Sequence, residues 1–141
     1  HANAVAAAIT LAQEKGAKKA VELPVSAPFH CALMQPAADA MRDALAGANM
    51  KAPVVPVVAN VNATATQDPE DIRDLLVAQV TGTVRWRESV IWMKDHGVEH
   101  MVELGAGKVL SGLVRRIDRE IACESVGTPE QIEALIAKLK G

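Results

Sequence analysis

Short apolar segments alternate with amphipathic segments of 10–15 residues, and this alternation constrains the fold more than any other feature. From residue 84 onward the order is helix, strand, helix, strand and helix, at residues 84–97, 98–104, 105–117, 121–127 and 128–140. Strands that alternate with helices of this length are typical of an α/β fold with a mostly parallel sheet. A length of 141 residues corresponds to about one domain.

The first half of the chain has the same two kinds of segment. Residues 2–15 form an alanine-rich helical pattern that ends at Gly16, and residues 68–80 form a helix with Asp68 as its N-cap. The remaining expected elements are a short strand at 18–25, a helix at 32–46, an apolar strand buried on both faces at 52–60 and a polar loop at 60–68.

Composition excludes several classes of function. The net charge is −2 and the chain has only three aromatic residues, so nucleic acid is not an expected partner. No long basic run occurs, so an anionic membrane is not an expected partner either, and no apolar run approaches 18 residues, so we expect a soluble protein. Cys31 and Cys123 fit no metal spacing or disulfide framework, so we expect reduced thiols and a cytoplasmic protein.

Three polar patterns have ordinary structural interpretations. The glycine-rich residues 105–107 follow a strand and precede a helix, where an anion could bind, but a tight turn explains them better. His96 and His100 have the spacing of a zinc pair, but Gly97 separates them and no third ligand is evident, so we expect no metal site. The charges of residues 115–120 fit a solvated helix face.

His30 is the strongest candidate for chemistry. It lies in a loop restricted by Pro24 and Pro28, with Phe29 as an apolar neighbour and a helix start behind it. A structural role remains open, because a histidine that acts as a general base also needs a nucleophile. No serine lies in a G-x-S-x-G elbow; the four serines are Ser26, Ser89, Ser111 and Ser125.

Four ordered motifs resemble a known family. They are LPVSAPFHCALM, NVNA, QVTGTVRWRESV and ELGAGKVLSGLVRRI, which begin at residues 23, 60, 79 and 103. In this order they resemble the C-terminal half of bacterial malonyl-CoA:acyl-carrier-protein transacylase. The resemblance implies part of an α/β-hydrolase-like parallel-sheet domain, preceded by the end of a ferredoxin-like subdomain. It places residues 1–23 in the small subdomain and residues 24–141 in the large domain.

The resemblance also assigns roles to three residues. By match, His30 is the general base that deprotonates a serine, and the main-chain carbonyl of Gln79 orients its imidazole. Phe29 is implied to be a substrate-binding residue that crowds out an α-methyl group and favours malonyl. The implied partners are malonyl-CoA and acyl carrier protein, with neither a metal nor a bound redox cofactor.

The nucleophilic serine, the oxyanion-hole donors and the arginine that binds the malonyl carboxylate belong to the family's N-terminal half. The sequence opens without Met inside a helical pattern, so we expect it to be part of a longer protein and inactive on its own. Two alternatives stay open. One is a carrier-protein interaction fragment that uses Arg115 and Arg116, and the other is a piece of a hydrolase that acts on esters.

Overall fold

The computed structural model describes residues 1–141, and it contains six α-helices, one 3-10 helix and two short sheets. The α-helices are α1 (Ala2–Glu14), α2 (Gln35–Ala46), α3 (Pro69–Thr81), α4 (Trp86–Asp95), α5 (Val109–Ile117) and α6 (Pro129–Lys140). The remaining elements are the 3-10 helix η1 (Ala32–Met34) and the strands β1 (Val57–Val58), β2 (Ala65–Thr66), β3 (His100–Leu104) and β4 (Ala122–Val126).

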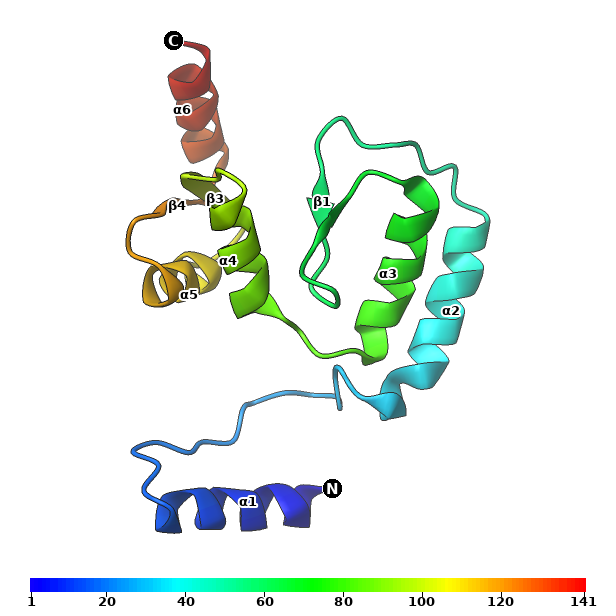
Figure 1. The fold of residues 1–141 in the computed structure, drawn as a ribbon, viewed down its shortest axis with the longest axis vertical. Coiled ribbons are helices and arrows are strands. Elements are labelled where there is room, and N and C mark those ends of the chain that lie inside the picture. The colour runs from blue at the N-terminus through cyan, green and yellow to red at the C-terminus, as the bar shows by residue number, and fades with distance from the viewer.

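The C-terminal half has the predicted α/β organisation. Strands β3 and β4 pair in parallel, from His100 opposite Ala122 to Leu104 opposite Val126. Helix α5 connects them, and helix α4 packs against α5 (Figure 1). This unit contains the small hydrophobic core of the chain, formed by Val90, Val114 and Ile121.

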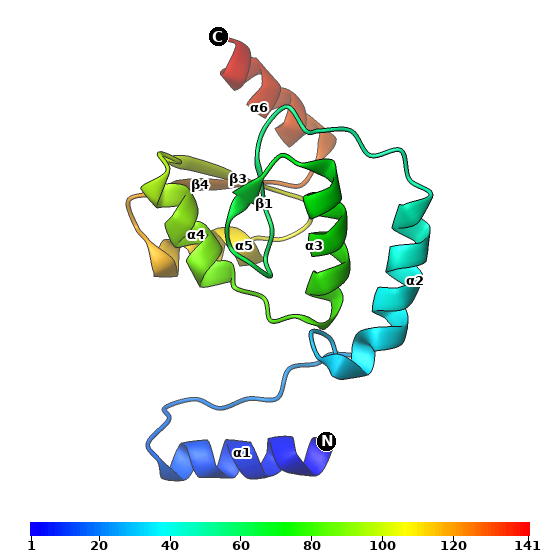
Figure 2. The ribbon, with the colours of Figure 1, turned by 45° about the vertical axis from the view of Figure 1, so that its right-hand side comes forward.

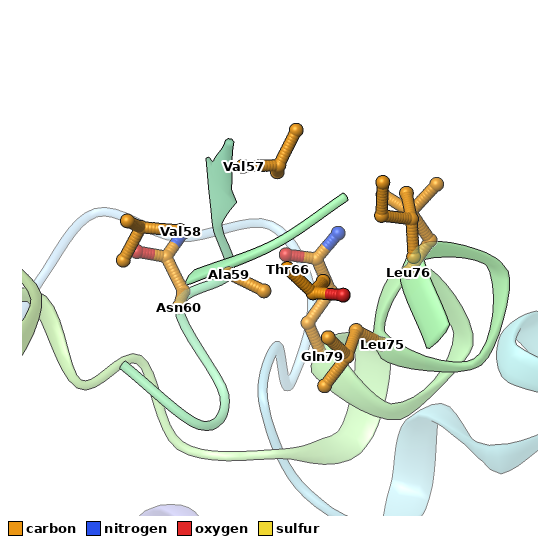
Figure 3. A pocket seen from close by; sticks show the side chains of 9 residues that line it. Val57, Val58, Ala59, Asn60, Thr66, Leu75, Leu76 and Gln79 are labelled. Atoms are coloured by element: carbon orange, nitrogen blue, oxygen red, sulfur yellow. The ribbon is translucent and has the colours of Figure 1, made fainter. Parts of the chain in front are cut away.

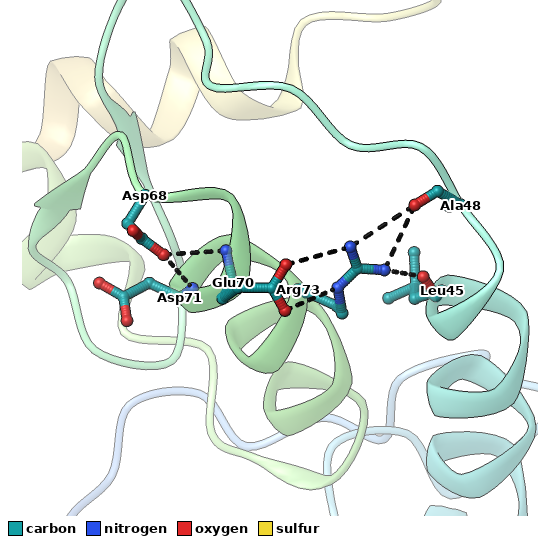
Figure 4. Close-up of polar contacts among 6 residues, drawn as sticks. All are labelled: Leu45, Ala48, Asp68, Glu70, Asp71 and Arg73. Atoms are coloured by element: carbon teal, nitrogen blue, oxygen red, sulfur yellow. Dashed lines mark hydrogen bonds and ion pairs between the residues drawn. The ribbon is translucent and has the colours of Figure 1, made fainter.

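Residues 35–81 form a second unit, made of two helices and a hairpin. Helices α2 and α3 pack side by side, and the hairpin of β1 and β2 lies next to α3 (Figures 1 and 2). The Arg73 guanidinium joins the two helices, because it bonds to the Leu45 and Ala48 carbonyls near the end of α2 and to Glu70 on its own helix (Figure 4). This contact fixes α3, which carries Gln79, relative to α2, which follows His30.

Local helix signals predicted several elements correctly. Asp68 caps α3 by accepting hydrogen bonds from the backbone N–H groups of Glu70 and Asp71. Thr128 and Gln131 form a reciprocal capping box at the start of α6. Pro36 lies in the first turn of α2, where the missing N–H of a proline costs no helical hydrogen bond.

Two predicted strands are wrong. Residues 18–25 form no strand, and only Val57 and Val58 of the segment 52–60 do so, in an antiparallel hairpin. Val54 is 97% exposed, so this segment is not buried on both faces. A strand needs a hydrogen-bonded neighbour, and these residues find none of sufficient length in the chain. The polar loop predicted at 60–68 contains the partner strand β2.

The chain exposes far more surface than a compact protein of its mass. Its accessible area is 10331 Å², whereas a compact protein of 14.9 kDa has about 7,000 Å². Only nine of the 141 residues are buried. Helix α1 has no buried residue and lies apart from the other helices at the end of an extended segment (Figures 1 and 2).

None of the helices combines the length and the apolar composition that crossing a bilayer requires.

Candidate functional site

His30 lies in a turn directly before η1. Its backbone φ is 58°, a left-handed conformation that residues other than glycine rarely adopt. Cys31 then returns to an extended conformation and acts as the N-cap of η1. The imidazole is exposed in this chain and projects toward α3, where it meets the main chain of Gln79.

The end of α3 leaves the Gln79 carbonyl free to accept a hydrogen bond. Gly82 has φ −85° and ψ 158°, so the helix stops there, and its N–H bonds to the Ala78 carbonyl at 3.0 Å. No backbone N–H beyond Gly82 bonds back to Gln79. The last carbonyls of a helix have no partner within the helix, and a side chain can satisfy them.

His30 provides that partner. Its Nδ1 lies 3.1 Å from the Gln79 carbonyl oxygen, across 49 positions of sequence. A carbonyl oxygen can only accept, so Nδ1 must carry the proton, and in the neutral ring Nε2 then has the free lone pair. The contact therefore fixes both the orientation of the imidazole and the tautomer that can act as a base at Nε2.

The bend after Gln79 is held by the NVNA segment, residues 60–63. A Cβ atom at Gly82 would lie 2.7 Å from Cγ2 of Val61 and 3.0 Å from the Ala78 carbonyl oxygen. The Arg85 N–H bonds to the Asn60 carbonyl at 2.8 Å, and the Arg85 guanidinium bonds to the Asn62 carbonyl at 3.1 Å. Two of the motifs that carry the resemblance thus contact each other behind the His30 site.

No serine of the chain is hydrogen-bonded to His30. Ser89 donates to the Arg85 carbonyl within α4, while Ser111 and Ser125 bond to each other and to the Glu103 carboxylate. The base that the sequence predicts therefore has no nucleophile bound to it in these 141 residues.

A cavity lies next to Gln79, but it does not include His30. It has a volume of about 110 Å³ and lies between the hairpin and α3 (Figure 3). Its lining consists mainly of apolar side chains: Val57, Val58, Ala59, Asn60, Thr66, Ile72, Leu75, Leu76 and Gln79. Pockets for small-molecule ligands usually measure about 300–1,000 Å³, so this space is too small for a coenzyme A thioester.

Phe29 lies beside His30 and is 53% exposed. Its backbone N–H bonds to the Ala27 carbonyl, and its ring is not part of the cavity beside Gln79. Phe29 thus adjoins His30 along the chain and leaves about half of its surface open.

The first turn of α5, which follows the glycine-rich residues 105–107, binds a carboxylate that the sequence analysis did not identify. The Glu103 carboxylate accepts from the N–H groups of Leu110 and Ser111 at 3.0 and 2.9 Å, and from the Ser111 hydroxyl at 2.7 Å. These donors lower the pKa of Glu103 to about 2. The first turn of α5 is therefore occupied by the chain's own carboxylate, and Gly105 and Gly107 have the positive φ of a tight turn.

His96 and His100 have separate partners. The His96 ring stacks on Trp92 with ring centroids 3.7 Å apart, and its Nδ1 lies 2.7 Å from the Trp92 carbonyl oxygen. His100 is paired with Glu124 at 3.4 Å. No cluster of three or more potential metal-ligating side chains occurs in the chain.

Both cysteines are free thiols. The Cys31 thiol donates to the Pro28 carbonyl at 3.1 Å, a contact that the sequence analysis missed. Cys123 packs against the core of the C-terminal half, and burial raises the pKa of its thiol.

Comparisons with known proteins agree over nearly the whole chain. The chain is 43% identical over 138 residues to the malonyl CoA-acyl carrier protein transacylase of Salmonella typhimurium, and 42% identical over 139 residues to that of Bacillus subtilis. These matches cover 98% and 99% of the chain. The chain is homologous to these transacylases. The chain spans about 45% of the length of these curated relatives, as expected if it corresponds to one half of such a protein.

Solved structures give the same result. The acyl-carrier-protein-S-malonyltransferase of Bartonella henselae is 55% identical and superposes with a TM-score of 0.89, covering 99% of this chain and 44% of that one. The malonyl CoA-acyl carrier protein transacylase of Coxiella burnetii is 37% identical, also with a TM-score of 0.89, over 100% of this chain and 45% of that one. These similarities confirm the predicted fold class. No family model matches the chain.

Proposed function

We propose that the chain is the C-terminal part of a malonyl-CoA:acyl-carrier-protein transacylase of bacterial fatty-acid synthesis. The observation that supports this most directly is the 3.1 Å contact between His30 Nδ1 and the Gln79 carbonyl oxygen. This contact supplies a base that is oriented and held in one tautomer, as acyl transfer through a serine ester requires. The names of the homologues supply the substrate classes.

In the proposed first half-reaction, His30 Nε2 accepts the proton of a serine hydroxyl from the part of the protein outside this chain. The serine oxygen attacks the thioester carbonyl carbon of malonyl-CoA, and the coenzyme A sulfur leaves with the proton that His30 returns. In the second half-reaction His30 deprotonates the phosphopantetheine thiol of acyl carrier protein. The thiolate takes the malonyl group from the ester, and the serine regains its proton. A positioned general base typically contributes about 10²–10⁴-fold to such a rate.

We assign Phe29 to the acyl subsite, where its ring would crowd an α-methyl group. The ring is adjacent in sequence to the base and is 53% exposed, so it is available to face a substrate bound between this chain and the remainder of the protein. Replacing Phe29 with a smaller residue should therefore widen acyl specificity without removing the base.

The remainder of the protein would cover the surface that this chain leaves open. We propose that it supplies the serine, the oxyanion-hole donors and an arginine for the malonyl carboxylate. The accessible area of 10331 Å², against about 7,000 Å² for a compact protein of this mass, supports a large partner. We further propose that residues 1–23 end the small subdomain, that residues 24–141 belong to the large one, and that the enzyme acts in the cytoplasm.

A carrier-protein interaction fragment is the second candidate. Arg115 and Arg116 are exposed in the last turn of α5, where they could meet an acidic carrier protein. A hydrolase would differ from both, because it transfers the acyl group to water and does not need to bind a malonyl carboxylate.

The test compares the chain alone with the complete protein that carries it, using malonyl-CoA and phosphopantetheinylated acyl carrier protein. We expect malonyl carrier protein as the product of the complete protein and no transfer by the 141-residue chain. Binding without transfer by the complete protein would favour the interaction fragment, and release of free malonate would favour the hydrolase. Transfer by the chain alone would refute the proposed division of the active site.

A further inference from the structure

The backbone conformation of His30 needs an explanation, because it is energetically unfavourable. His30 and Ala63 are the only residues other than glycine with a positive φ in the chain. A left-handed conformation of such a residue is strained and persists only where the surroundings enforce it. The contacts that enforce it at His30 therefore also determine where the imidazole points.

The backbone provides little of this enforcement. Residues 29 and 30 form a turn, but no backbone hydrogen bond of normal geometry crosses it. The Phe29 N–H bonds to Ala27 before the turn, and the next such bond joins the Met34 N–H to the Cys31 carbonyl after it. Pro28 fixes its own φ but has no N–H to contribute.

One side-chain contact does cross the turn. The Cys31 Sγ donates to the Pro28 carbonyl oxygen at 3.1 Å, so it joins the residues on both sides of Phe29 and His30. Cys31 is also the extended N-cap residue of η1, which connects the turn to the start of the following helices. Cys31 is half-buried, whereas His30 beside it is exposed.

We propose that Cys31 is a positioning residue, whose thiol closes the turn and thereby holds His30 Nδ1 on the Gln79 carbonyl. The catalytic consequence rests on the proposed function, but the effect on the imidazole does not. A serine hydroxyl at position 31 would donate to the same carbonyl, and an alanine methyl would not. The two substitutions therefore separate hydrogen bonding from the mere presence of a small side chain.

The experiment uses the complete protein that carries this chain, with Cys31→Ala, Cys31→Ser and Cys123→Ala. Cys123→Ala is the matched control, because it removes the other thiol in the C-terminal core. With ¹⁵N-labelled histidine, we expect the hydrogen-bonded Nδ1–H resonance of His30 in the wild type, the serine variant and the control, and its loss in Cys31→Ala. In malonyl transfer, Cys31→Ala should lower kcat about tenfold or more with little change in KM, and Cys31→Ser should recover most of it.

Each result supports or overturns the inference. A Cys31→Ala variant that keeps the Nδ1–H resonance and its kcat overturns it, and so does a folded Cys31→Ser variant that loses both. If Cys31→Ala does not fold, the serine variant alone decides. If the wild type shows the resonance and Cys31→Ala loses it, but the wild type transfers no malonyl group, the proposed function is refuted and the positioning role stands.

Discussion

Replacing Val90 with alanine tests whether the small core between α4 and α5 stabilises the C-terminal half. Val90 is completely buried and contacts Val114 and Ile121. The substitution removes two methyl groups, each worth about 0.8 kcal/mol of transfer free energy, and leaves a cavity that the neighbours fill only in part. We expect the free energy of unfolding to fall by about 2–3 kcal/mol.

Val54→Ala is the matched control, since Val54 is 97% exposed. Urea unfolding of the 141-residue chain, followed by tryptophan fluorescence, suits the comparison because Trp86 packs against the core. With a slope near 2 kcal/mol per M, Val90→Ala should lower the urea midpoint by about 1 M, whereas Val54→Ala should shift it by less than about 0.3 M. Equal shifts would refute the assignment of the core.

The same pair of variants tests whether another part of the protein covers the segment 52–58. In the complete protein Val54→Ala should become destabilising, by about 1.6 kcal/mol or more, because the side chain would then be buried. A substitution that stays neutral in the complete protein would contradict burial of this segment by another part of the protein.

Three further predictions concern other parts of the fold. The pKa of Glu103 is lowered to about 2, so the carboxylate stabilises the fold above pH 4.5 and this contribution is lost as the pH falls toward 2. The urea midpoint of the Glu103→Gln variant should lack this part of the pH dependence. Gly127→Ala would place a Cβ atom 2.7 Å from the Gly105 carbonyl oxygen and should cost about 1–3 kcal/mol of unfolding free energy, whereas Gly47→Ala, with no atom within 4 Å, should not destabilise the chain. Arg73→Ala removes a guanidinium that bonds to two carbonyls near the end of α2. It should lower the free energy of unfolding by about 2 kcal/mol, and Arg73→Lys should recover only part of that loss.

The elements that the sequence predicts well depend on local chemistry. Asp68 and Thr128 precede helices whose first turns supply the N–H groups that they accept from, and both caps are present in the structure. The parallel pair of β3 and β4 also follows from its pattern, because each strand is followed by a helix in the same unit.

The strands at 18–25 and 52–60 fail for the opposite reason. Their apolar residues indicate burial, but burial and pairing depend on a neighbouring strand, and the chain offers these segments none beyond the two-residue pair of β1 and β2. Val21, Val54 and Val55 are accordingly exposed. An apolar run alone does not specify which residues will pack against it.

The candidate site also combines one feature that local sequence predicts with others that depend on distant neighbours. The Pro-restricted loop singled out His30, but the sequence pattern does not pair it with Gln79, 49 positions away; the resemblance did so, and the structure has the two in contact. The sequence analysis missed the roles of the Glu103 carboxylate and the Cys31 thiol. The N–H group that donates to Glu103 and the carbonyl that accepts from Cys31 come into reach only when the turns fold.

The most direct test of the central claim is the rate of malonyl transfer by the complete protein with His30→Ala, measured beside His96→Ala. His96, the C-cap residue of α4, bonds to the carbonyl of Trp92 and has no role in the proposed site. We predict that His30→Ala lowers kcat by at least about 10²-fold, as expected for the loss of a general base, and that His96→Ala leaves it within about twofold. A His30→Ala enzyme that transfers malonyl at the wild-type rate would contradict the account.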